Sequence, residues 1–481
     1  MSRLASLSGM DAAFLALETP NTPMNVIGTF LLEPASAGGR DACERIVQLL
    51  EHRLARLAPF RRRLVPVPFG LDRSVWIDDP DFRVRSHIHR VTASAPGSER
   101  VLADLVARIA VSPLDPTRPL WALWVVEDLS EERVALVFKL HHALADGVSA
   151  ARLLLQLFDP SPQVPAAERF PEPAQPEPAP TRQALLTHAL ARLPERSMRL
   201  VRLLRTTAAS IDSGLARSIS RSALGAPHMP MPFSAPRLPW NGATSSRRSA
   251  AYGSARLADV KAIAAAFGAS VNQVVLAACT QTLRNYLEAH GGAPEVPLVA
   301  AVPVSLRSPD ELETYGNRIS AFLVHLPVHL ADPLEQLRAV REDALSARQL
   351  YTRLGVGALA EWAEFASSML LGAAARLYSG FALAGRHRPL HNLVISNVRG
   401  PTDPLYLAGA RLGAVYPLGP LMDGAGMNIT VASYAESVAF GIIACGRSVP
   451  QVADIALGFG AGVADLRKLA LEASQSSPVR R

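Results

Sequence analysis

The sequence predicts a two-domain protein of the α/β class. The chain has 481 residues, which is more than one ordinary hydrophobic core accommodates. Hydrophobic residues make up 49% of it, enough for a well-buried interior. Segments with the apolar pattern of strands alternate with segments that have the 3.6-residue period of helices. We expect an N-terminal domain at residues 1–159, a linker at 160–246 and a C-terminal domain at 247–481.

The first domain is expected to contain three helices, at residues 7–15, 41–57 and 102–111. Prolines then rule out regular structure up to residue 119, and a strand begins at Leu120. This strand should pair with the one that follows it in the chain. His87 and His89 stand in a polar stretch, so we expect both at the surface.

The central segment of this domain is a strand that leads directly into two histidines. Residues 134–140 are mostly apolar and predict a buried strand, with His141 and His142 at its end. Asp146 and Gly147 supply turn chemistry, because one side chain bonds locally and the other residue is free to adopt positive φ. One imidazole is therefore held at a strand end, with a carboxylate four residues further on.

An imidazole in this position suits a general base that takes a proton from a hydroxyl or a thiol. Its unperturbed pKa of ~6.5 leaves the neutral form available at neutral pH. Two buried structural histidines are the more common explanation for an isolated pair of this kind. A zinc site is not expected, because adjacent strand residues point to opposite faces and no Cys or His-x3-His partner lies nearby.

The predicted linker has two parts of different composition. Residues 160–180 contain eight prolines and should be extended. Residues 182–222 carry eight arginines against two acidic residues, a surplus of +6 within a net charge of +7. The arginines recur at helical spacing, with Pro194 expected to interrupt the helix. This segment is either a solvated face of a packed helix or a helix lying on an anionic membrane or lipid droplet.

Composition narrows the setting of the protein. The charge outside the basic segment is close to zero, which argues against a nucleic-acid-binding domain. The cysteines, Cys43, Cys279 and Cys445, are scattered, as in cytoplasmic proteins with reduced thiols. Residues 1–20 lack the apolar core of a signal peptide, and residues 365–375 are too few for a spanning helix of ~18 residues. We expect a cytoplasmic protein, peripheral on the inner membrane face or on lipid droplets.

The second domain is expected to alternate helices and strands. Ser270 or Asn272 can cap its long apolar helix. Helices are predicted at 257–263, 271–287, 334–374 and 457–472, and strand-like segments at 299–307, 316–320 and between 392 and 445.

The pattern His-His-x-x-x-Asp-Gly at residues 141–147 resembles the signature of acyltransferases that include chloramphenicol acetyltransferase and peptide-synthetase condensation domains. In those enzymes the second histidine is the base, and the aspartate holds the site together rather than touching the imidazole.

Several further blocks resemble the bacterial wax ester synthase/diacylglycerol acyltransferase family, and they follow the same order over most of the chain. Three departures are visible: Asn25 where a His is usual, Gln273 where an Asp is usual, and Cys445 near a common acidic position. The matching blocks are Leu7-Ser8 with Asp11 and Phe14-Leu15; Pro119-Leu120-Trp121; His141-His142 with Asp146-Gly147; Val271-Asn272 with Val274-Val275-Leu276-Ala277; Val302-Pro303-Val304-Ser305-Leu306-Arg307; and Ser396-Asn397 with Gly400-Pro401.

This resemblance implies two chloramphenicol-acetyltransferase-like domains, each a mixed sheet flanked by helices, that meet at a substrate tunnel. Acyl-CoA would enter from one side, and a long-chain alcohol or diacylglycerol from the other. Two long apolar substrates need such an apolar channel, and a domain interface provides one. Acyl-CoA is a substrate here, so no cofactor is expected.

The implied reaction is direct acyl transfer with His142 as general base. The chain has no Gly-x-Ser-x-Gly elbow, so no covalent acyl-enzyme is expected. His141 and Gly147 would support the base, and Asp146 would pair with Arg307 of the second domain. Trp121 is a further support of the site, and the candidates for binding substrate or the oxyanion are Asn272, Ser305, Ser396 and Asn397.

Two other functions remain open from the sequence. One is a condensation-type acyltransferase whose donor is carried on a carrier protein. The other is a lipid-surface binding protein that keeps this fold without turnover.

Overall fold

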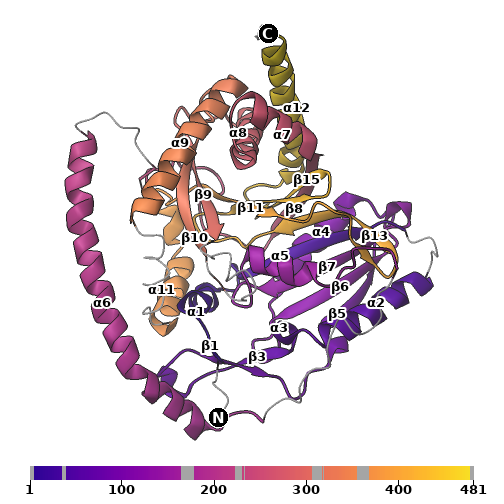
Figure 1. Ribbon diagram of the computed structural model, residues 1–481, viewed down its shortest axis with the longest axis vertical. Coiled ribbons are helices and arrows are strands. Elements are labelled where there is room, and N and C mark those ends of the chain that lie inside the picture. Colours follow the sequence, from indigo (N-terminus) through magenta and orange to yellow (C-terminus); the bar gives the residue numbers. More distant parts are fainter. Residues whose placement is uncertain are drawn as a thin grey trace, which may run out of the picture.

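The computed structural model describes residues 5–34, 40–163, 178–222, 230–231, 233–305, 317, 319–354 and 368–476. Two six-stranded sheets and a small three-stranded sheet form its framework (Figure 1). Each large sheet contains both parallel and antiparallel neighbours, which confirms the predicted mixed α/β class.

The first large sheet holds the histidine-bearing strand in its middle, in the order β12-β13-β2-β7-β6-β5. β7 lies between β2 and β6 and is antiparallel to both; its pairing with β6 is as the sequence predicts. Because β7 is buried on both faces, its run of apolar residues needs no polar alternation. The bounds are β2 Asn25–Leu32, β5 Ile88–Thr92, β6 Trp121–Glu127, β7 Val134–His141, β12 Tyr406–Leu407 and β13 Ala410–Leu418.

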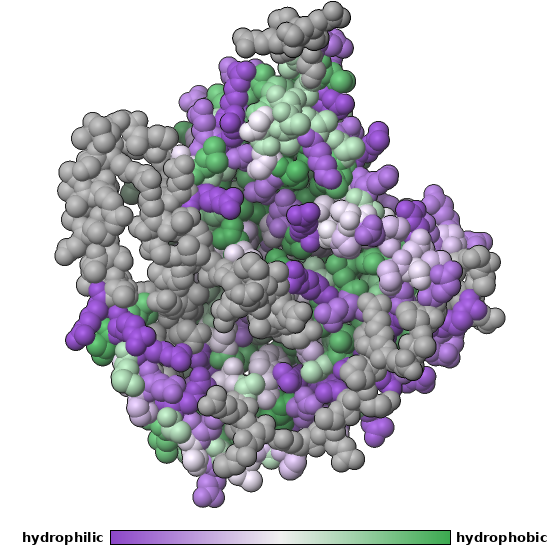
Figure 2. Space-filling model, viewed as in Figure 1, coloured by the Kyte–Doolittle hydropathy of each residue, from purple (hydrophilic) through white to green (hydrophobic). Residues whose placement is uncertain are grey.

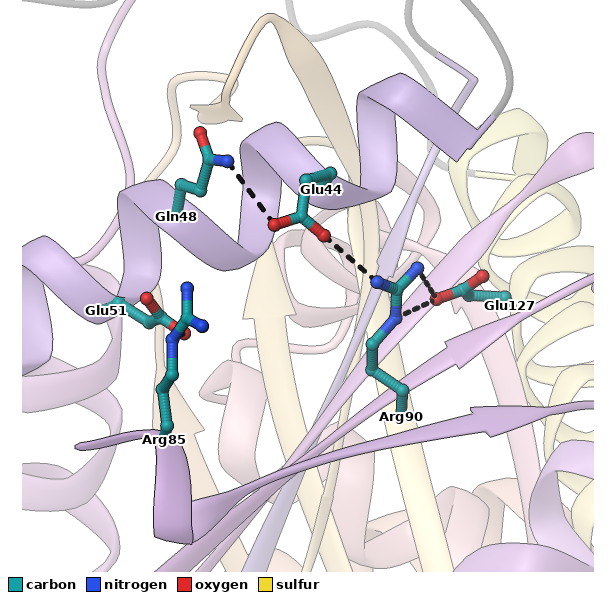
Figure 3. A network of polar contacts seen from close by, with 6 residues as sticks. All are labelled: Glu44, Gln48, Glu51, Arg85, Arg90 and Glu127. Atoms are coloured by element: carbon teal, nitrogen blue, oxygen red, sulfur yellow. Dashed lines mark hydrogen bonds and ion pairs between the residues drawn. The ribbon is translucent and has the colours of Figure 1, made fainter. Parts of the chain in front are cut away.

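Helices cover both faces of this sheet. On one face, α2 (Arg40–Leu54) and α5 (Gly147–Leu155) pack on β2 and β7 through residues such as Leu50, Leu153 and Phe138. On the other face, α4 (Glu99–Val111) packs on Ile27 and Val137. α2 is also held at the sheet edge by polar contacts (Figure 3). They are ion pairs among Glu44, Glu51, Arg85, Arg90 and Glu127, and a hydrogen bond from Gln48 to Glu44.

A buried lysine connects α4 to β7, the strand that ends in the two histidines. Lys139 on β7 is fully buried, and its ammonium donates to the carbonyls of Ile109 and Ser112 and to the Ser112 hydroxyl. A cation at the last carbonyls of a helix complements the helix dipole. Burial nevertheless lowers the pKa of Lys139 to about 8, with the charge of Glu18 acting in the opposite direction.

The second large sheet has the order β10-β9-β11-β14-β15-β8. Its core is lined by α8 and α12, with α7 and α9 beside them, and Figure 1 shows these helices above the sheet. The bounds are α7 Leu257–Ala266, α8 Val271–Ala289, α9 Pro333–Leu354, α12 Val452–Ser476, β8 Arg248–Arg256, β9 Leu298–Ser305, β10 Ile319–Leu326, β11 Leu393–Arg399, β14 Met427–Tyr434 and β15 Ser437–Cys445.

Strand β13 joins the two halves of the molecule. It comes from the C-terminal part of the chain, yet it pairs with β2 in the first sheet. A side chain on Gly441 of β15 would collide with the Pro417 carbonyl of β13, so only glycine allows this close approach. The hydroxyls of Thr29 on β2 and Tyr252 on β8 lie 3.2 Å apart across the same junction. Apolar residues also show between the two halves in Figure 2.

Helix α1 (Gly9–Leu17) lies beside the junction and packs on α11 (Ser368–Gly380). Its N-terminus carries a complete capping box, in which Ser8 and Asp11 each bond the other's backbone NH. Strand β1 (Ala5–Ser6) precedes α1 and pairs with β4 (Val75–Asp78). β4 also pairs with β3 (Arg62–Val65), which follows the short helix α3 (Ala58–Arg61) in the chain.

Helix α6 (Arg182–Ser222) runs along the outside of the molecule (Figure 1). The helix continues through Pro194, so the expected interruption there is wrong. Leu185 and Ala189 pack on Val67 and Val75, and they anchor the first turns to the protein. Leu190, Met198, Val201 and Leu204 are among the exposed apolar residues further along.

Two further expectations can be compared with the described residues. His87 is buried and stacks on Trp121 with ring centroids 4.6 Å apart, so its surface assignment is wrong; His89 is exposed as expected. No single described helix is long and apolar enough to span a membrane. The pair α7 and α8, bent by 102°, meets that test by length and composition alone.

Candidate active site

The two histidines lie at the end of β7, where the chain turns into α5. The backbone NH of His142 donates to the Met24 carbonyl at 2.7 Å, which prolongs the pairing of β2 with β7 by one residue. Asp146 is the N-cap of α5, and its Oδ1 accepts from the Ser149 NH at 2.8 Å. Strand pairing on one side and a capped helix on the other fix the loop between them.

The imidazole of His142 is held on two sides. The ring of Phe14 on α1 stacks on it, with centroids 3.9 Å apart and an interplanar angle of 17°. Its Nδ1 lies 2.9 Å from Oδ1 of Asn317, a residue of the second half of the chain. The side chain is 8% exposed, so little freedom remains for the ring.

The partners of Asn317 determine which nitrogen of His142 carries the proton. The Asn317 amide group donates to Oδ1 of Asp11, at 2.7 Å, and to the carbonyl of His142. The Asp11 carboxylate and the His142 carbonyl can only accept, so the group of Asn317 that faces them is its NH2 group. The other side-chain atom of Asn317, Oδ1, faces Nδ1 of the imidazole and must accept a hydrogen bond from it. Nδ1 therefore carries hydrogen in the neutral ring, and the lone pair lies on Nε2.

Asp11 holds this amide in place from α1. Its Oδ1 also accepts from the Asn317 backbone NH at 3.0 Å, and its Oδ2 accepts from the Ser8 NH at 3.1 Å. Burial raises the pKa of the Asp11 carboxyl, while the hydrogen bonds from Asn317 and Ser8 oppose that shift. Each oxygen faces a backbone donor, which is the arrangement expected for a carboxylate.

Burial also determines the basicity of His142. It lowers the pKa of His142 to about 4, against the raising effects of the Asn317 hydrogen bond and the nearby Asp146 charge. The imidazole is therefore neutral at physiological pH. A proton that it takes up is held weakly and is readily passed on.

His141 is arranged differently from its neighbour. Its Nδ1 accepts from the Ala143 NH at 3.0 Å, so its Nε2 carries hydrogen and faces the Glu18 carboxylate at 3.4 Å. Burial raises the pKa of Glu18, but His141, the Met24 NH and the charge of Lys139 together outweigh it, and the net shift is downward. Nδ1 of His141 thus bonds within the loop, and its Nε2 lies within ion-pair distance of Glu18.

The structure places Gly147 against the second half of the protein. A Cβ at this position would lie 3.7 Å from Cγ2 of Val398 on β11, the residue after Asn397. Asp146 is fully buried beside it. The predicted partner Arg307 lies outside the described residues, so this pair stays a prediction.

The candidates for binding the oxyanion or substrate lie on three elements of the second half. Nδ2 of Asn397 donates to Oδ1 of Asn272 in the first turn of α8, at 3.2 Å. Ser396 precedes Asn397 on β11 and is half-buried, whereas Ser305 is exposed at the end of β9. Trp121 belongs to the first half, where its indole NH donates to the Phe60 carbonyl at 2.7 Å.

The three departures from the family pattern have different surroundings. Asn25 is buried opposite His141, and its amide has no hydrogen-bond partner among the described residues. Gln273 completes a capping box with Ser270, which is therefore the N-cap of α8. Burial raises the pKa of the Cys445 thiol, but hydrogen bonds led by Ser245 bring it down to about 7.

Sequence reasoning did not identify Asn317 as a partner of His142, or Asp11 as the residue that holds Asn317. The two residues are 306 positions apart. Asp11 and Phe14 were visible only as parts of a matching block. Their spacing of three places them on one face of α1, which is the local signal for a shared target.

This chain matches two family models and is similar to solved structures. The model described as wax ester synthase/diacylglycerol acyltransferase catalytic domain matches residues 7–275, and the WS/DGAT C-terminal domain matches residues 315–467. "Putative diacyglycerol O-acyltransferase MT1809" of Mycobacterium tuberculosis is 35% identical over 474 residues, 98% of this chain and 91% of the relative. "Putative diacyglycerol O-acyltransferase MT3848" of the same organism is 36% identical over 448 residues, 93% of this chain and 96% of the relative.

Among solved structures, the wax ester synthase/diacylglycerol acyltransferase from Marinobacter aquaeolei VT8 is 28% identical with a TM-score of 0.68, covering 97% of this chain and 100% of that one. The first condensation domain of the calcium-dependent antibiotic synthetase is 16% identical with a TM-score of 0.56, covering 97% and 96%. At this identity the second likeness shows the fold alone.

Proposed function

Since the chain belongs to the wax ester synthase/diacylglycerol acyltransferase family, we propose that it transfers a long-chain acyl group from acyl-CoA to an alcohol. The acceptor is a long-chain alcohol, giving a wax ester, or the free hydroxyl of diacylglycerol, giving triacylglycerol. The names of the Mycobacterium tuberculosis relatives favour diacylglycerol.

The observation that carries the proposal is the state of His142. Asn317 keeps hydrogen on Nδ1, and burial keeps the ring neutral, so Nε2 presents a lone pair to an incoming hydroxyl. General base catalysis of this kind contributes on the order of 10²–10⁴ in rate.

In the proposed reaction, Nε2 of His142 removes the hydroxyl proton while the alcohol oxygen attacks the thioester carbonyl carbon. A new C–O bond forms and the carbonyl oxygen becomes an oxyanion. Its collapse breaks the C–S bond, and the imidazolium returns the proton to the departing CoA thiolate. The electrons and protons balance without a covalent acyl-enzyme or a cofactor.

The oxyanion needs a donor, and the candidate hydroxyls and amides lie in the second half of the chain. One such donor contributes about 3 kcal/mol of transition-state stabilisation. The pair of Asn272 and Asn397 is our first candidate, because it lies where β11, the strand that contacts Gly147 through Val398, meets the first turn of α8. Ser396 and Ser305 are the alternative oxyanion donors. In this proposal the substrates reach the site through a tunnel between the two large sheets.

We also propose that α6 attaches the protein to an anionic surface, the inner membrane face or a lipid droplet. Beyond its anchored first turns, exposed Leu190, Met198, Val201 and Leu204 alternate with exposed Arg199 and Arg202. Arginines with apolar neighbours on an exposed helix are typical of interfacial helices. The acceptor and the ester product of the reaction are apolar, so such a location would bring the acceptor to the site.

The test is turnover with purified protein and labelled palmitoyl-CoA, with hexadecanol and diolein offered separately and products identified by mass. The His142→Ala variant should lose transfer but keep its fold, whereas His89→Ala, at an exposed histidine, should keep both. Near-normal rates in His142→Ala with an inactive His141→Ala would reverse the assignment. Turnover only with acyl-carrier-protein donors would favour a condensation-type enzyme, and no turnover with any donor a binding protein.

A further inference from the structure

Helix α11 has an exposed apolar stripe. Leu370, Leu377 and Phe381 are 67%, 58% and 60% exposed, and they follow one another at intervals of seven and four residues. The Phe381 NH still bonds to the Leu377 carbonyl at 2.9 Å, so Phe381 continues the helical turn. Met369, beside the stripe, is 74% exposed. Four large apolar side chains on one surface helix are more than scattered exposure explains.

The opposite side of α11 is packed against α1. A Cβ on Gly372 would lie 3.2 Å from the Ala16 carbonyl, so the two helices touch there backbone to backbone. With about 100° per residue, the positions of Leu370, Leu377 and Phe381 lie across the helix from Gly372. The apolar stripe therefore faces away from the protein.

A second segment extends this surface at the end of α11. Phe233 is 54% exposed and packs edge-on against His387, with ring centroids 5.6 Å apart. His387 in turn bonds through Nε2 to the Tyr378 hydroxyl of α11 at 2.7 Å. Met231, two residues before Phe233, is 71% exposed. We call Met231, Phe233, Met369 and the stripe residues Leu370, Leu377 and Phe381 the α11 surface.

The rim of the α11 surface is basic. Arg386, Arg388 and Arg237 are all exposed, and residues 368–390 contain no aspartate or glutamate. Arg237 donates to the His387 carbonyl at 2.9 Å, which ties its segment to this rim. Asp423 is a carboxylate whose charge acts on the Tyr378 hydroxyl. Its Oδ1 already accepts hydrogen bonds from the NH and the hydroxyl of Thr244.

We propose that the α11 surface docks on the anionic face of a phospholipid layer. Apolar side chains inserted below the headgroups, with arginines at headgroup level, match its composition. A second copy of the same face is a poorer occupant, because a two-fold contact would bring the arginines of both copies together.

Docking through α11 would place the lipid layer on the side of α11 that faces away from α1, with α11 and α1 between the layer and the proposed base. Within α1, Ala16 lies against α11 and Phe14 against His142. A diacylglycerol or long-chain alcohol in the layer would then enter beside α1 without crossing water. This part of the inference rests on the proposed acyltransferase function, whereas docking itself does not.

The experiment compares full-length protein with the double variant Leu377→Glu/Phe381→Glu. The matched control is Leu457→Glu/Phe69→Glu, which changes a leucine and a phenylalanine that are 78% and 90% exposed elsewhere. Co-sedimentation is measured with phosphatidylcholine vesicles, with and without phosphatidylglycerol. We expect at least a tenfold loss of binding to the anionic vesicles in the α11 variant and no loss in the control.

Acyl transfer is then measured with diolein in those vesicles and with a water-soluble short-chain alcohol. The α11 variant should lose the vesicle reaction and keep the soluble one. The inference is overturned if the α11 variant binds anionic vesicles as well as wild type, or if wild type binds uncharged vesicles equally well. In either case, any acyl transfer by the protein leaves the proposed function standing. A wild-type dimer that the α11 variant converts to monomer, with vesicle binding retained, identifies a second copy as the occupant and overturns the inference too.

Discussion

Nδ1 of His142 lies 2.9 Å from Oδ1 of Asn317, although 175 residues separate the two in the chain. The bond joins the strand that ends in the two histidines to the second half of the molecule. Asn317 is itself held by Asp11, which belongs to the first helix. The proposed base is therefore oriented by two residues that its own sequence motif does not contain.

The first prediction concerns Asn317. In Asn317→Ala the imidazole loses the acceptor that keeps hydrogen on Nδ1, so a fraction of rings present Nε2–H instead of a lone pair. We expect kcat to fall on the order of 10- to 100-fold, with KM for acyl-CoA little changed. Steady-state kinetics with palmitoyl-CoA measure both constants.

Gln48→Ala is the control, because Gln48 is an amide of the outer network shown in Figure 3. Circular dichroism establishes that each variant is folded. An unchanged kcat in folded Asn317→Ala would contradict the orienting role.

The second prediction concerns pH. Because burial lowers the pKa of His142 to about 4, the base stays neutral well below the ordinary value of 6.5. The acid limb of kcat/KM should therefore have its midpoint below pH ~5 rather than near 6.5. A midpoint at 6.5 would show that the ring is hydrated in the working enzyme.

The same shift affects stability. The unfolded chain binds more protons between pH 4 and 6.5, so stability falls as the pH is lowered through this range. His391 behaves alike, since burial lowers its pKa to about 4 as well. Unfolding must therefore be followed alongside activity, and only rates from folded protein enter the profile.

The third prediction is the pair of Asp146 and Arg307. A fully buried carboxylate requires more than the Ser149 NH to compensate for its lost hydration, and a cation from the second half would supply it. A double-mutant cycle with Asp146→Asn and Arg307→Gln should give a coupling free energy above ~1 kcal/mol in urea unfolding. Additive effects would leave Arg307 as a solvated side chain.

The fourth prediction concerns α6. Replacing Arg199, Arg202 and Arg205 by Gln should weaken binding to anionic vesicles by about 3 kcal/mol, on the order of 100-fold. Arg192 is left unchanged because its NH1 lies 3.5 Å from Oδ2 of Asp72 and belongs to the packed part of the helix.

The matched control replaces Arg108, Arg256 and Arg338, three exposed arginines on other elements, and so removes the same net charge. Equal co-sedimentation of the two triple variants would mean that α6 is a solvated helix without a lipid-binding role.

Local patterns were sufficient for most of the fold. The apolar run of residues 134–140 became β7, the capping signal at Ser270 became the start of α8, and the mixed α/β class was confirmed. These features depend on neighbours within a few positions, which a sequence displays directly. The surface assignment of His87 failed because it depends on a distant residue, Trp121, which stacks on the imidazole. The expected break at Pro194 failed although proline disfavours a helix interior, since α6 continues through it.

By itself, the sequence determined where an imidazole meets a strand end and which family pattern surrounds it. Only the tertiary structure decided which nitrogen can act as base, because that choice depends on Asn317 and Asp11, brought together across 306 positions. It also decided that α11 backs onto α1 with its apolar side outward, since Gly372 permits the contact with Ala16. Hydrogen-bond partners and packed faces are properties of residues close in space, and spacing along a chain does not encode them.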